Sequence, residues 1–365
     1  RIVDANWNDI NKGIGGIIAI PKAPADGIVS KVTDDEIVIT EPTGTKHTVQ
    51  LYNNFPLNAE SFIHNEPKVK IGDRVKGGDI LADNNNTRDG EFAIGANLRV
   101  AYIPWKGYNY EDSTIVSESA AKKLTSEHLY GFGAKRSSKG VFSREKFKAY
   151  YPEEVNSKKM SKLDKDGVIK VGETVDHDDI LIAHMERRAP TADDLALGRL
   201  DKQLKKDFAN NAIKWDKDHK GIVTSVEKHG NNVTVNVKTE EPLKVADKVS
   251  GLHGNKHIVS RIVPDSEMPV TEDGKRIDIT MNPIGVSNRI NTSQILEAAA
   301  GKVAEKTGEQ YTIQNFQDVD NTNKLIDDMK KAGVEEKEYI IDPITGKKTK
   351  NKVMTIVAAL TDGDF

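Results

Sequence analysis

The chain contains no cysteine and no long apolar run, and both absences narrow what it can be. Without cysteine it has no disulfide, no thiol nucleophile and no cysteine-ligated zinc site, which fits a reducing compartment. The longest apolar run, residues 14–20, includes two glycines and is too short to span a bilayer. The sequences HExxH, GxSxG and Walker A are also missing, which excludes the usual zinc-protease, serine-hydrolase and P-loop sites.

The composition is that of an ordered protein, because 37% of the 365 residues are hydrophobic and 30% are charged. This length allows two or three domains. Short strands are predicted where Val, Ile and Thr alternate with polar residues, at 28–32, 36–40, 233–237 and 277–280, with a hairpin turn at 229–232. Helices are predicted for three segments: 118–124 with Ser117 as N-cap, 192–210, and 293–306.

Two segments far apart in the chain share one pattern, Val69–Leu81 and Ile169–Leu181. Each has a partner of the form Gly-Ile-Val-x-x-Val, at 27–32 before the first copy and at 221–226 after the second. Glycine followed by an acid is a turn signature, so we expect two related β modules. Residues 176–179, Asp-His-Asp-Asp, look like a metal cluster, but they occupy the turn of the second copy and are interpreted as turn residues.

The segment Lys244–Arg261, KVADKVSGLHGNKHIVSR, concentrates positive charge in a chain whose net charge is −3. Lys248 and Lys256 flank a glycine-rich bend, and a local group of cations indicates an anion site. Glycines let backbone N–H groups approach an anion, and lysine suits a phosphate. A solvated surface turn is the alternative interpretation.

Two further segments carry residues suited to the same chemistry. Residues 101–112 combine aromatic side chains, a turn and the adjacent carboxylates Glu111 and Asp112. On a strand such neighbours point to opposite faces, so one site takes both only if a turn redirects them. Carboxylates suit magnesium, which takes oxygen ligands. Residues 278–291 contain Pro283 and Gly285, which predict an irregular loop carrying Arg289, and arginine can grip phosphate oxygens bidentately.

Together these segments resemble the C-terminal half of the β subunit of bacterial-type multisubunit DNA-dependent RNA polymerase. Residues 104–118, PWKGYNYEDSTIVSE, resemble that family's PWxGYNxEDAIxxSE. Residues 246–297 resemble its long GDKxxGRHGNKG to MNxGQxLE string almost without gaps, and the likeness covers about Ala25 to Val303. It departs at Leu252 and His257, where the family has arginine and glycine. A shortened, divergent half-subunit is similar to the split polymerases of large bacteriophages.

The resemblance implies a mainly β fold with some helices, in which a discontinuous double-psi β-barrel is joined to barrel-sandwich, flap-like modules. A barrel-sandwich module is expected at 1–89 and the barrel core at 90–130 and 242–300. A flap-like insertion is expected at 131–241. Residues 301–365 would form a helix after the barrel and a partial clamp or switch-proximal segment.

The resemblance also implies a function, that of a β-type subunit of a DNA-directed RNA polymerase, a nucleotidyltransferase active only within a multisubunit complex. Lys248 and Lys256 would contact phosphates of the RNA 3′ end and the incoming nucleotide, and Arg289 the outer phosphates of that nucleotide. His253 and Asn255 would help to bind nucleic acid. Glu111 and Asp112 would lie near the nucleotide-bound metal, Asp112 through water. The Mg²⁺ itself would be bound mainly by the partner β′-type subunit.

The expected partners are β′-type chains, a chain with the N-terminal half of β, a promoter-specificity factor, the DNA template, the RNA transcript and NTPs, but no membrane. The expected location is the cytoplasm, which for a phage protein means the host cytoplasm or the virion. A non-catalytic nucleic-acid-binding scaffold is the alternative. Leu252 in place of arginine favours the scaffold, whereas Lys248, Lys256 and Arg289 argue against it. An unrelated enzyme on a barrel-sandwich fold is less well supported, because no lipoyl- or biotin-type lysine hairpin is present.

Overall fold

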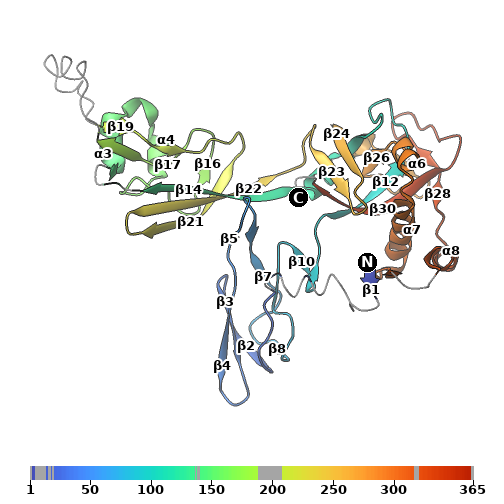
Figure 1. Cartoon of the computed structure of the whole chain (residues 1–365), viewed down its shortest axis with the longest axis horizontal. Coiled ribbons are helices and arrows are strands. Elements are labelled where there is room, and N and C mark those ends of the chain that lie inside the picture. Colours follow the sequence, from blue (N-terminus) through green and yellow to red (C-terminus); the bar gives the residue numbers. More distant parts are fainter. Residues whose placement is uncertain are drawn as a thin grey trace. The chain divides into compact units, whose positions relative to one another are not determined.

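The structure is a computed structural model that describes residues 2–4, 14, 18, 20–135, 137, 140–187, 208–315 and 320–362. The chain divides into two compact units. The barrel unit consists of residues 1–53, 64–126 and 242–365, and the insertion unit of residues 54–63 and 127–241. Strands outnumber helices in both (Figure 1). No helix in the described ranges combines the length and apolar character needed to cross a membrane.

The barrel unit contains β1 (Ile2–Asp4), β2 (Gly27–Val32), β3 (Glu36–Thr40), β4 (Lys46–Gln50), β7 (Asn65–Pro67), β8 (Arg74–Val75), β9 (Ala82–Asn84), β10 (Thr87–Arg88), β11 (Glu91–Phe92), β12 (Ala96–Tyr102), β13 (Ser113–Ser117), α2 (Glu118–Lys123), β23 (Lys248–Gly251), β24 (Lys256–Val263), η3 (Asp265–Glu267), β25 (Val270–Thr271), β26 (Ile279–Met281), α6 (Ile284–Arg289), α7 (Thr292–Thr307), β27 (Ile313–Asn315), α8 (Asn321–Ala332), β28 (Lys337–Glu338), β29 (Ile340–Ile341) and β30 (Val353–Asp362).

Six strands of this unit close into a mixed barrel in the order β12-β26-β13-β24-β23-β30, because β30 pairs back with β12. The pairs β12–β26 and β13–β24 are parallel, and the other four pairs are antiparallel. Alternate residues of β12, Leu98, Val100 and Tyr102, point into the barrel core. This arrangement confirms the expected fold class, a mainly β chain built on a discontinuous barrel.

The strand that closes the barrel comes from near the end of the chain. β30 pairs with β12 from Ala96↔Leu360 to Ala101↔Thr355, and also with β23. α7 packs against it so closely that a Cβ on Gly301 would overlap the carbonyl oxygen of Val357. Residues 301–365 were predicted to follow the barrel, and this strand was not predicted. Its run Ile-Val-Ala-Ala-Leu has no polar alternation, so periodicity does not separate strand from helix there.

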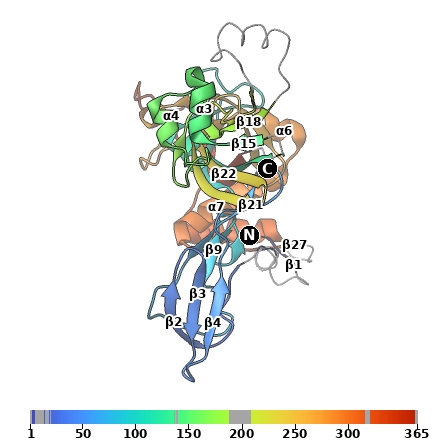
Figure 2. The same ribbon diagram turned by 90° about the vertical axis from the view of Figure 1, so that its left-hand side faces the viewer.

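The internal repeat is confirmed by matching backbone pairs in the two modules. Gly27 of β2 pairs with Val75 of β8, and Gly221 of β21 (Gly221–His229) pairs with Val175 of β16 (Thr174–Val175). A Cβ at either glycine would overlap a side chain of the neighbouring strand, Ile39 or Val237. Only glycine permits this close approach. Figure 2 shows the first of these modules, in which β2, β3 and β4 form an antiparallel sheet.

The insertion unit contains β5 (Phe55–Pro56), β6 (Phe62–Ile63), β14 (Ser126–Lys135), β15 (Gly140–Phe142), α3 (Arg144–Tyr150), η1 (Pro152–Glu154), α4 (Ser157–Ser161), β16, β17 (Ile180–Ile182), β18 (His184–Arg187), β19 (Phe208–Asn210), β20 (Ile213–Lys214), β21 and β22 (Asn232–Glu241). Its core gathers around Trp215, Phe147 and Leu163, which are fully buried. Residues 176–179 form the expected turn, because the Asp176 N–H donates to the Asp179 carboxylate at 2.8 Å.

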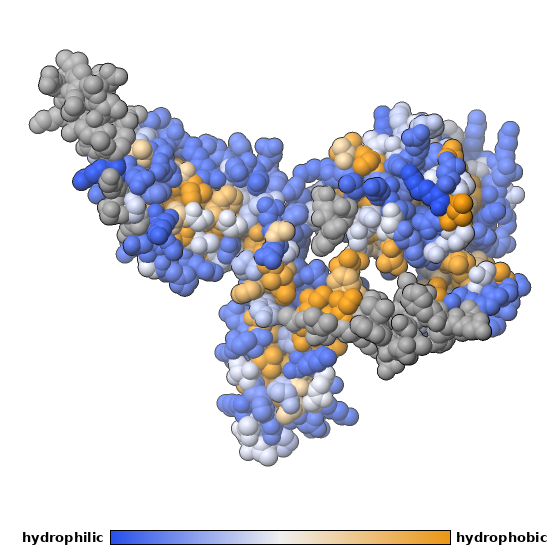
Figure 3. Space-filling model, in the orientation of Figure 1, coloured by the Kyte–Doolittle hydropathy of each residue, from blue (hydrophilic) through white to orange (hydrophobic). Residues whose placement is uncertain are grey.

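The helix predictions have mixed outcomes. α2, with Ser117 accepting a hydrogen bond from the Ala120 N–H, and α7 are confirmed. The helix predicted at 192–210 lies mostly outside the described residues, and its last three residues form β19 instead. Helices α3, α4 and α8 were not predicted. The irregular loop predicted around Pro283 and Gly285 is wrong, because Ile284–Arg289 form the short helix α6 with Pro283 at its N-cap. The surface shown in Figure 3 is largely hydrophilic, with hydrophobic residues in smaller groups.

The contact between α7 and β30 leads to a test of barrel closure. Helix propensity alone predicts that Gly301→Ala stabilises α7 by about 1 kcal/mol. The overlap with the Val357 carbonyl predicts the opposite, a loss of about 1–3 kcal/mol in the free energy of unfolding, because β30 must shift. Urea unfolding measures the difference. Ser293→Ala, on the exposed side of the same helix, is the control and should change stability by less than about 0.5 kcal/mol. A more stable Gly301→Ala variant would contradict the contact.

Candidate functional site

Strand direction brings three of the predicted segments to one end of the barrel. β13 runs parallel to β24 and antiparallel to β26, so the starts of β13 and β24 lie beside the end of β26. Residues 104–112 lead into β13, Lys256 begins β24, and α6 follows β26 and carries Arg289. The carboxylates, the lysine segment and the arginine segment therefore meet at this end.

The two lysines lie on the same face of the β23–β24 hairpin. Lys248 is directly opposite Ile258 and Ser250 is directly opposite Lys256, so the lysines are diagonal neighbours. Such neighbours are about 7–8 Å apart, and both lysines are exposed to solvent. Between them Val249 is opposite His257, and both of these are buried. The hairpin therefore presents two ammonium groups outward above an apolar inner face.

The glycine-rich bend is the loop of this hairpin. The Gly251 N–H donates to the Asn255 carbonyl at 2.8 Å, and Gly254 has a φ of +75°, which favours glycine. A Cβ on Gly251 would overlap the Asn255 side chain. The His253 ring lies 2.9 Å from the carboxylate of Glu297 in α7. Asn255 therefore shapes the loop and His253 attaches it to α7, and their contact with nucleic acid stays a prediction.

Arg289 and Asp112 form a bidentate ion pair, although 177 positions separate them in the chain. Nη1 and Nη2 of Arg289 donate to the two carboxylate oxygens at 2.6 and 2.7 Å. The guanidinium holds the pKa of Asp112 below its usual range. A Cβ on Gly285 would lie 3.1 Å from Nη1, so the glycine leaves room for the pair. The pair links the loop before β13 to α6.

The backbone of Glu111 does not have the conformation of a β-strand. Its φ is +50°, in the left-handed region, so it lies in a turn and not in an extended strand. The carboxylates of Glu111 and Asp112 are therefore not forced to opposite faces of a sheet. Asp112 is engaged by Arg289, whereas Glu111 adds a weaker electrostatic contribution to the raised pKa of Arg289.

Two buried asparagines hold in place the carboxylate loop, residues 104–112, which carries Glu111 and Asp112. The Asn109 side chain accepts a hydrogen bond from the Trp105 N–H and donates to the Ile103 carbonyl, both at 2.7 Å. The Asn282 side chain donates to the Asn109 carbonyl and accepts from the Ile284 N–H. Neither residue was predicted as part of the site, although asparagine before proline, as at Asn282-Pro283, is a turn signal.

His257 is the buried neighbour of Lys256, with 5% of its surface exposed. Burial lowers the pKa of its ring, and the charge of Asp112 opposes this shift. The adjacent Ile258 N–H donates to the Asp112 carbonyl at 2.8 Å. His257, one of the two departures from the resembled family, is therefore next to a residue that is hydrogen-bonded to the carboxylate loop.

The described side chains of this chain do not supply enough ligands to hold a metal ion without other groups. No group of three or more His, Asp and Glu side chains suited to a metal occurs in the described ranges. Magnesium usually keeps several waters and takes one or two carboxylates together with substrate phosphates. Glu111 and Asp112 fit that smaller contribution.

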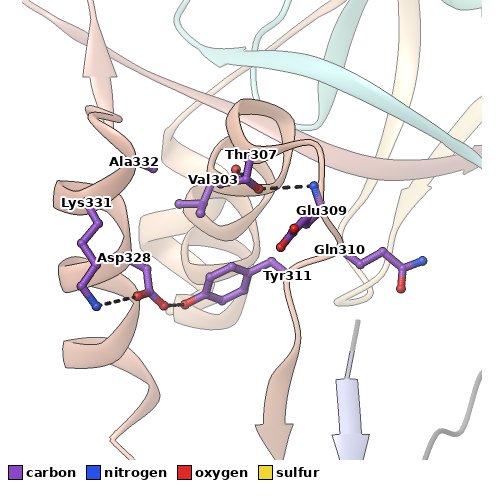
Figure 4. Close-up of a pocket in the computed structure, with 8 residues that line it drawn as sticks. All are labelled: Val303, Thr307, Glu309, Gln310, Tyr311, Asp328, Lys331 and Ala332. Carbon is purple, nitrogen blue, oxygen red and sulfur yellow. Dashed lines mark hydrogen bonds and ion pairs between the residues drawn. The ribbon is translucent and has the colours of Figure 1, made fainter.

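A separate hollow of about 330 Å³ lies between α7 and α8 (Figure 4). Tyr311 donates to the Asp328 carboxylate at 2.9 Å, and burial followed by this contact raises the pKa of Tyr311 to about 12. Lys331 approaches the other carboxylate oxygen of Asp328. None of the predicted site residues lines this hollow.

The described structure is thus a closed mixed barrel with two exposed lysines and an aspartate–arginine pair at one end. The chain belongs to the family described as RNA polymerase Rpb2, domain 6, whose model matches residues 22–358. The β subunit of DNA-directed RNA polymerase from Mycoplasmopsis synoviae is 33% identical over 350 residues, which cover 88% of this chain and 28% of that subunit.

Two further relatives have the same description. The β subunit from Acetivibrio thermocellus is 31% identical over 93% of this chain and 28% of its own length. The β subunit from Borrelia duttonii is 33% identical over 91% of this chain and 31% of its own length. The chain thus spans less than a third of these relatives. The resemblance to a β-subunit region is confirmed, whereas a split, phage-encoded origin stays a prediction.

The residue after Arg289 has an unusual backbone. Ile290 ends α6 in the left-handed region, with a φ of +51°, and 80% of its surface is exposed. A β-branched residue is disfavoured there, at a cost of roughly 1–2 kcal/mol. Its exposed side chain gains little from burial to offset this cost.

Replacing Ile290 with asparagine should therefore stabilise the chain. Asparagine tolerates the left-handed region, so Ile290→Asn is expected to raise the free energy of unfolding by about 0.5–1 kcal/mol. Ile284→Asn, at an exposed position of α6 without a positive φ, should give no gain. Denaturant midpoints at unchanged m-value measure both. A loss of stability in Ile290→Asn would show that the isoleucine side chain makes a stabilising contact.

Proposed function

We propose that this chain is the barrel-bearing, C-terminal part of the β-type large subunit of a DNA-directed RNA polymerase, acting in RNA synthesis within a multisubunit complex. One observation carries the proposal: Lys248 and Lys256 share an outward face at the barrel end where Arg289 also lies. Membership of the Rpb2 domain 6 family supports it. The proposed activity is nucleotidyl transfer by the assembled enzyme.

In this proposal the two lysines hold phosphates of the RNA 3′ end and of the incoming nucleotide. A unit charge about 4 Å from a phosphate contributes about 4 kcal/mol at an effective dielectric near 20, before desolvation. The hairpin fixes the backbone positions from which the two lysines extend on one face, so both ammonium groups can reach the same anion. Arg289 binds the outer phosphates through the same two N–H groups that now contact Asp112.

The magnesium ions of the reaction belong mainly to the β′-type partner in this proposal. When bound, they neutralise charge on the phosphates and lower the barrier to attack by the RNA 3′ oxygen. Glu111 and Asp112 lie near the nucleotide-bound ion, Asp112 through water. The other proposed partners are a chain carrying the N-terminal half of β, a promoter-specificity factor, template DNA, RNA and NTPs. The proposed location is the cytoplasm, of the host cell if the chain is encoded by a phage.

A non-catalytic scaffold is the second candidate function. Leu252, which stands where the resembled family has arginine, is 64% exposed in the hairpin loop. A leucine there removes one cation from the site. The rate of RNA extension by lysine variants distinguishes a catalytic subunit from a scaffold.

Changing either lysine to alanine should slow RNA extension by the assembled polymerase. Lys256→Ala is expected to reduce the rate at least about tenfold, a loss of about 1.4 kcal/mol, because a phosphate contact in the transition state is removed. Lys256→Arg tests geometry, since the planar guanidinium need not fit a site shaped for ammonium. Lys46→Ala, at an exposed lysine of β4, should extend RNA at the wild-type rate. Unchanged elongation in Lys248→Ala and Lys256→Ala would favour the scaffold.

Changing Arg289 should act mainly on nucleotide affinity. Arg289→Ala is expected to raise the apparent KM for NTPs at least about fivefold and to change kcat less, because outer-phosphate contacts exist both in the ground state and in the transition state. Steady-state extension across a range of NTP concentrations separates the two parameters. Arg88→Ala, at an exposed arginine of β10, is the matched control. An unchanged KM would remove Arg289 from the nucleotide site.

A further inference from the structure

The two N–H groups that would hold a phosphate on Arg289 are already occupied. Both terminal nitrogens of Arg289 donate to Asp112 in parallel, at 2.6 and 2.7 Å. A carboxylate and a phosphate present oxygen pairs of similar spacing to a guanidinium, so the two compete for the same donors. The proposed nucleotide-binding arginine thus has a competitor within the chain.

The position of this pair is set by the backbone on both sides. Glu111, just before Asp112, and Ile290, just after Arg289, both have left-handed backbones with φ near +50°. Gly285 leaves the space that the guanidinium occupies. The buried Asn109 and Asn282 attach the Asp112 loop to the end of β26, from which α6 continues. Two strained residues and a buried frame make the pair a defined feature of the fold, unlike a chance surface contact.

The exposure of the pair indicates that an anion can displace it. The Asp112 and Arg289 side chains are 42% and 57% exposed, and ion pairs of that exposure are weak. A competitor of this strength reduces the affinity of an anion for Arg289 by at most about fivefold and does not prevent binding.

We propose that Asp112 is a latch on Arg289, a built-in competitor that holds the arginine until a polyphosphate displaces the carboxylate. This rests on the proposed function, because it takes the phosphate-binding role of Arg289 as given. The latch lowers the affinity of the empty site for any anion that uses Arg289. It also keeps the guanidinium oriented toward the barrel end that carries Lys256, whose charge contributes to the low pKa of Asp112.

Charge repulsion between Asp112 and the anion would also make Asp112→Asn bind the anion more tightly, because removing any carboxylate near an anion site improves anion binding. Glu111 supplies the control for it. It is the adjacent carboxylate, it is exposed, and it also acts on Arg289 electrostatically. Glu111→Gln removes the same charge from almost the same place and leaves the bidentate contact between Asp112 and Arg289 intact.

The experiment measures binding of magnesium-free inorganic tripolyphosphate to the full chain by titration calorimetry. Asp112→Asn should lower Kd about three- to fivefold, whereas Glu111→Gln should lower it less than about twofold. In an Arg289→Ala background, the gain from Asp112→Asn should fall to the level of Glu111→Gln, because no latch is left to open. Unfolding curves establish that each variant is folded, and a variant that does not fold is replaced by Asp112→Ser.

Two results would overturn the latch: equal gains from Asp112→Asn and Glu111→Gln, or a gain from Asp112→Asn that persists without Arg289. Failure of the latch is distinguishable from failure of the proposed function. If only the latch is wrong, Arg289→Ala still raises the nucleotide KM of the assembled polymerase. If Arg289 has no part in nucleotide binding, that KM stays unchanged whatever the calorimetry shows.

Discussion

The pairing of β13 with two neighbours of opposite direction is the constraint on which the site depends. β24 runs parallel to β13 and β26 runs antiparallel to it, so the starts of two strands and the end of a third meet. Three segments that are distant in the chain thereby deliver carboxylates, a lysine and an arginine to one barrel end. Antiparallel pairing alone would place the starts of β13 and β24 at opposite ends. The barrel closure by β30 holds this sheet in a ring, since β30 joins β23 to β12.

The site combines a buried frame with exposed charges. Asn109, Asn282 and the inward-facing Val249 and His257 are buried, and they fix the backbone from which the charged side chains extend. Lys248 and Lys256 are exposed and hydrated, whereas Arg289 is exposed but paired with Asp112. The Asn109 and Asn282 side chains are buried with hydrogen-bond partners, which rigidifies the loop and suits the proposed anion site.

Much of the fold could be predicted from the sequence, and so could the segments that meet at this barrel end. The turn residues of the repeat predicted two related modules, and the glycines between Lys248 and Lys256 predicted the bend that joins β23 to β24. The pairing of Asp112 with Arg289 could not be predicted, because nothing local reports a contact across 177 positions. β30 was not identified because its apolar run suits helix and strand equally. The frame of Asn109 and Asn282 was missed because their hydrogen bonds to main chain appear only once the loop is built.

Leu252 and His257, the two departures from the resembled family, lie at positions that do not change where the lysines project from the hairpin. Strand alternation sends residue 257 to the inner face of β24, so an imidazole there changes the surroundings of Asp112 and leaves Lys256 pointing outward. Residue 252 lies in the hairpin loop, where leucine changes the charge near the lysines but not the register of β23 and β24. The backbone pairing therefore determines where the cations lie, whereas the substituted side chains change the charge and the packing around them.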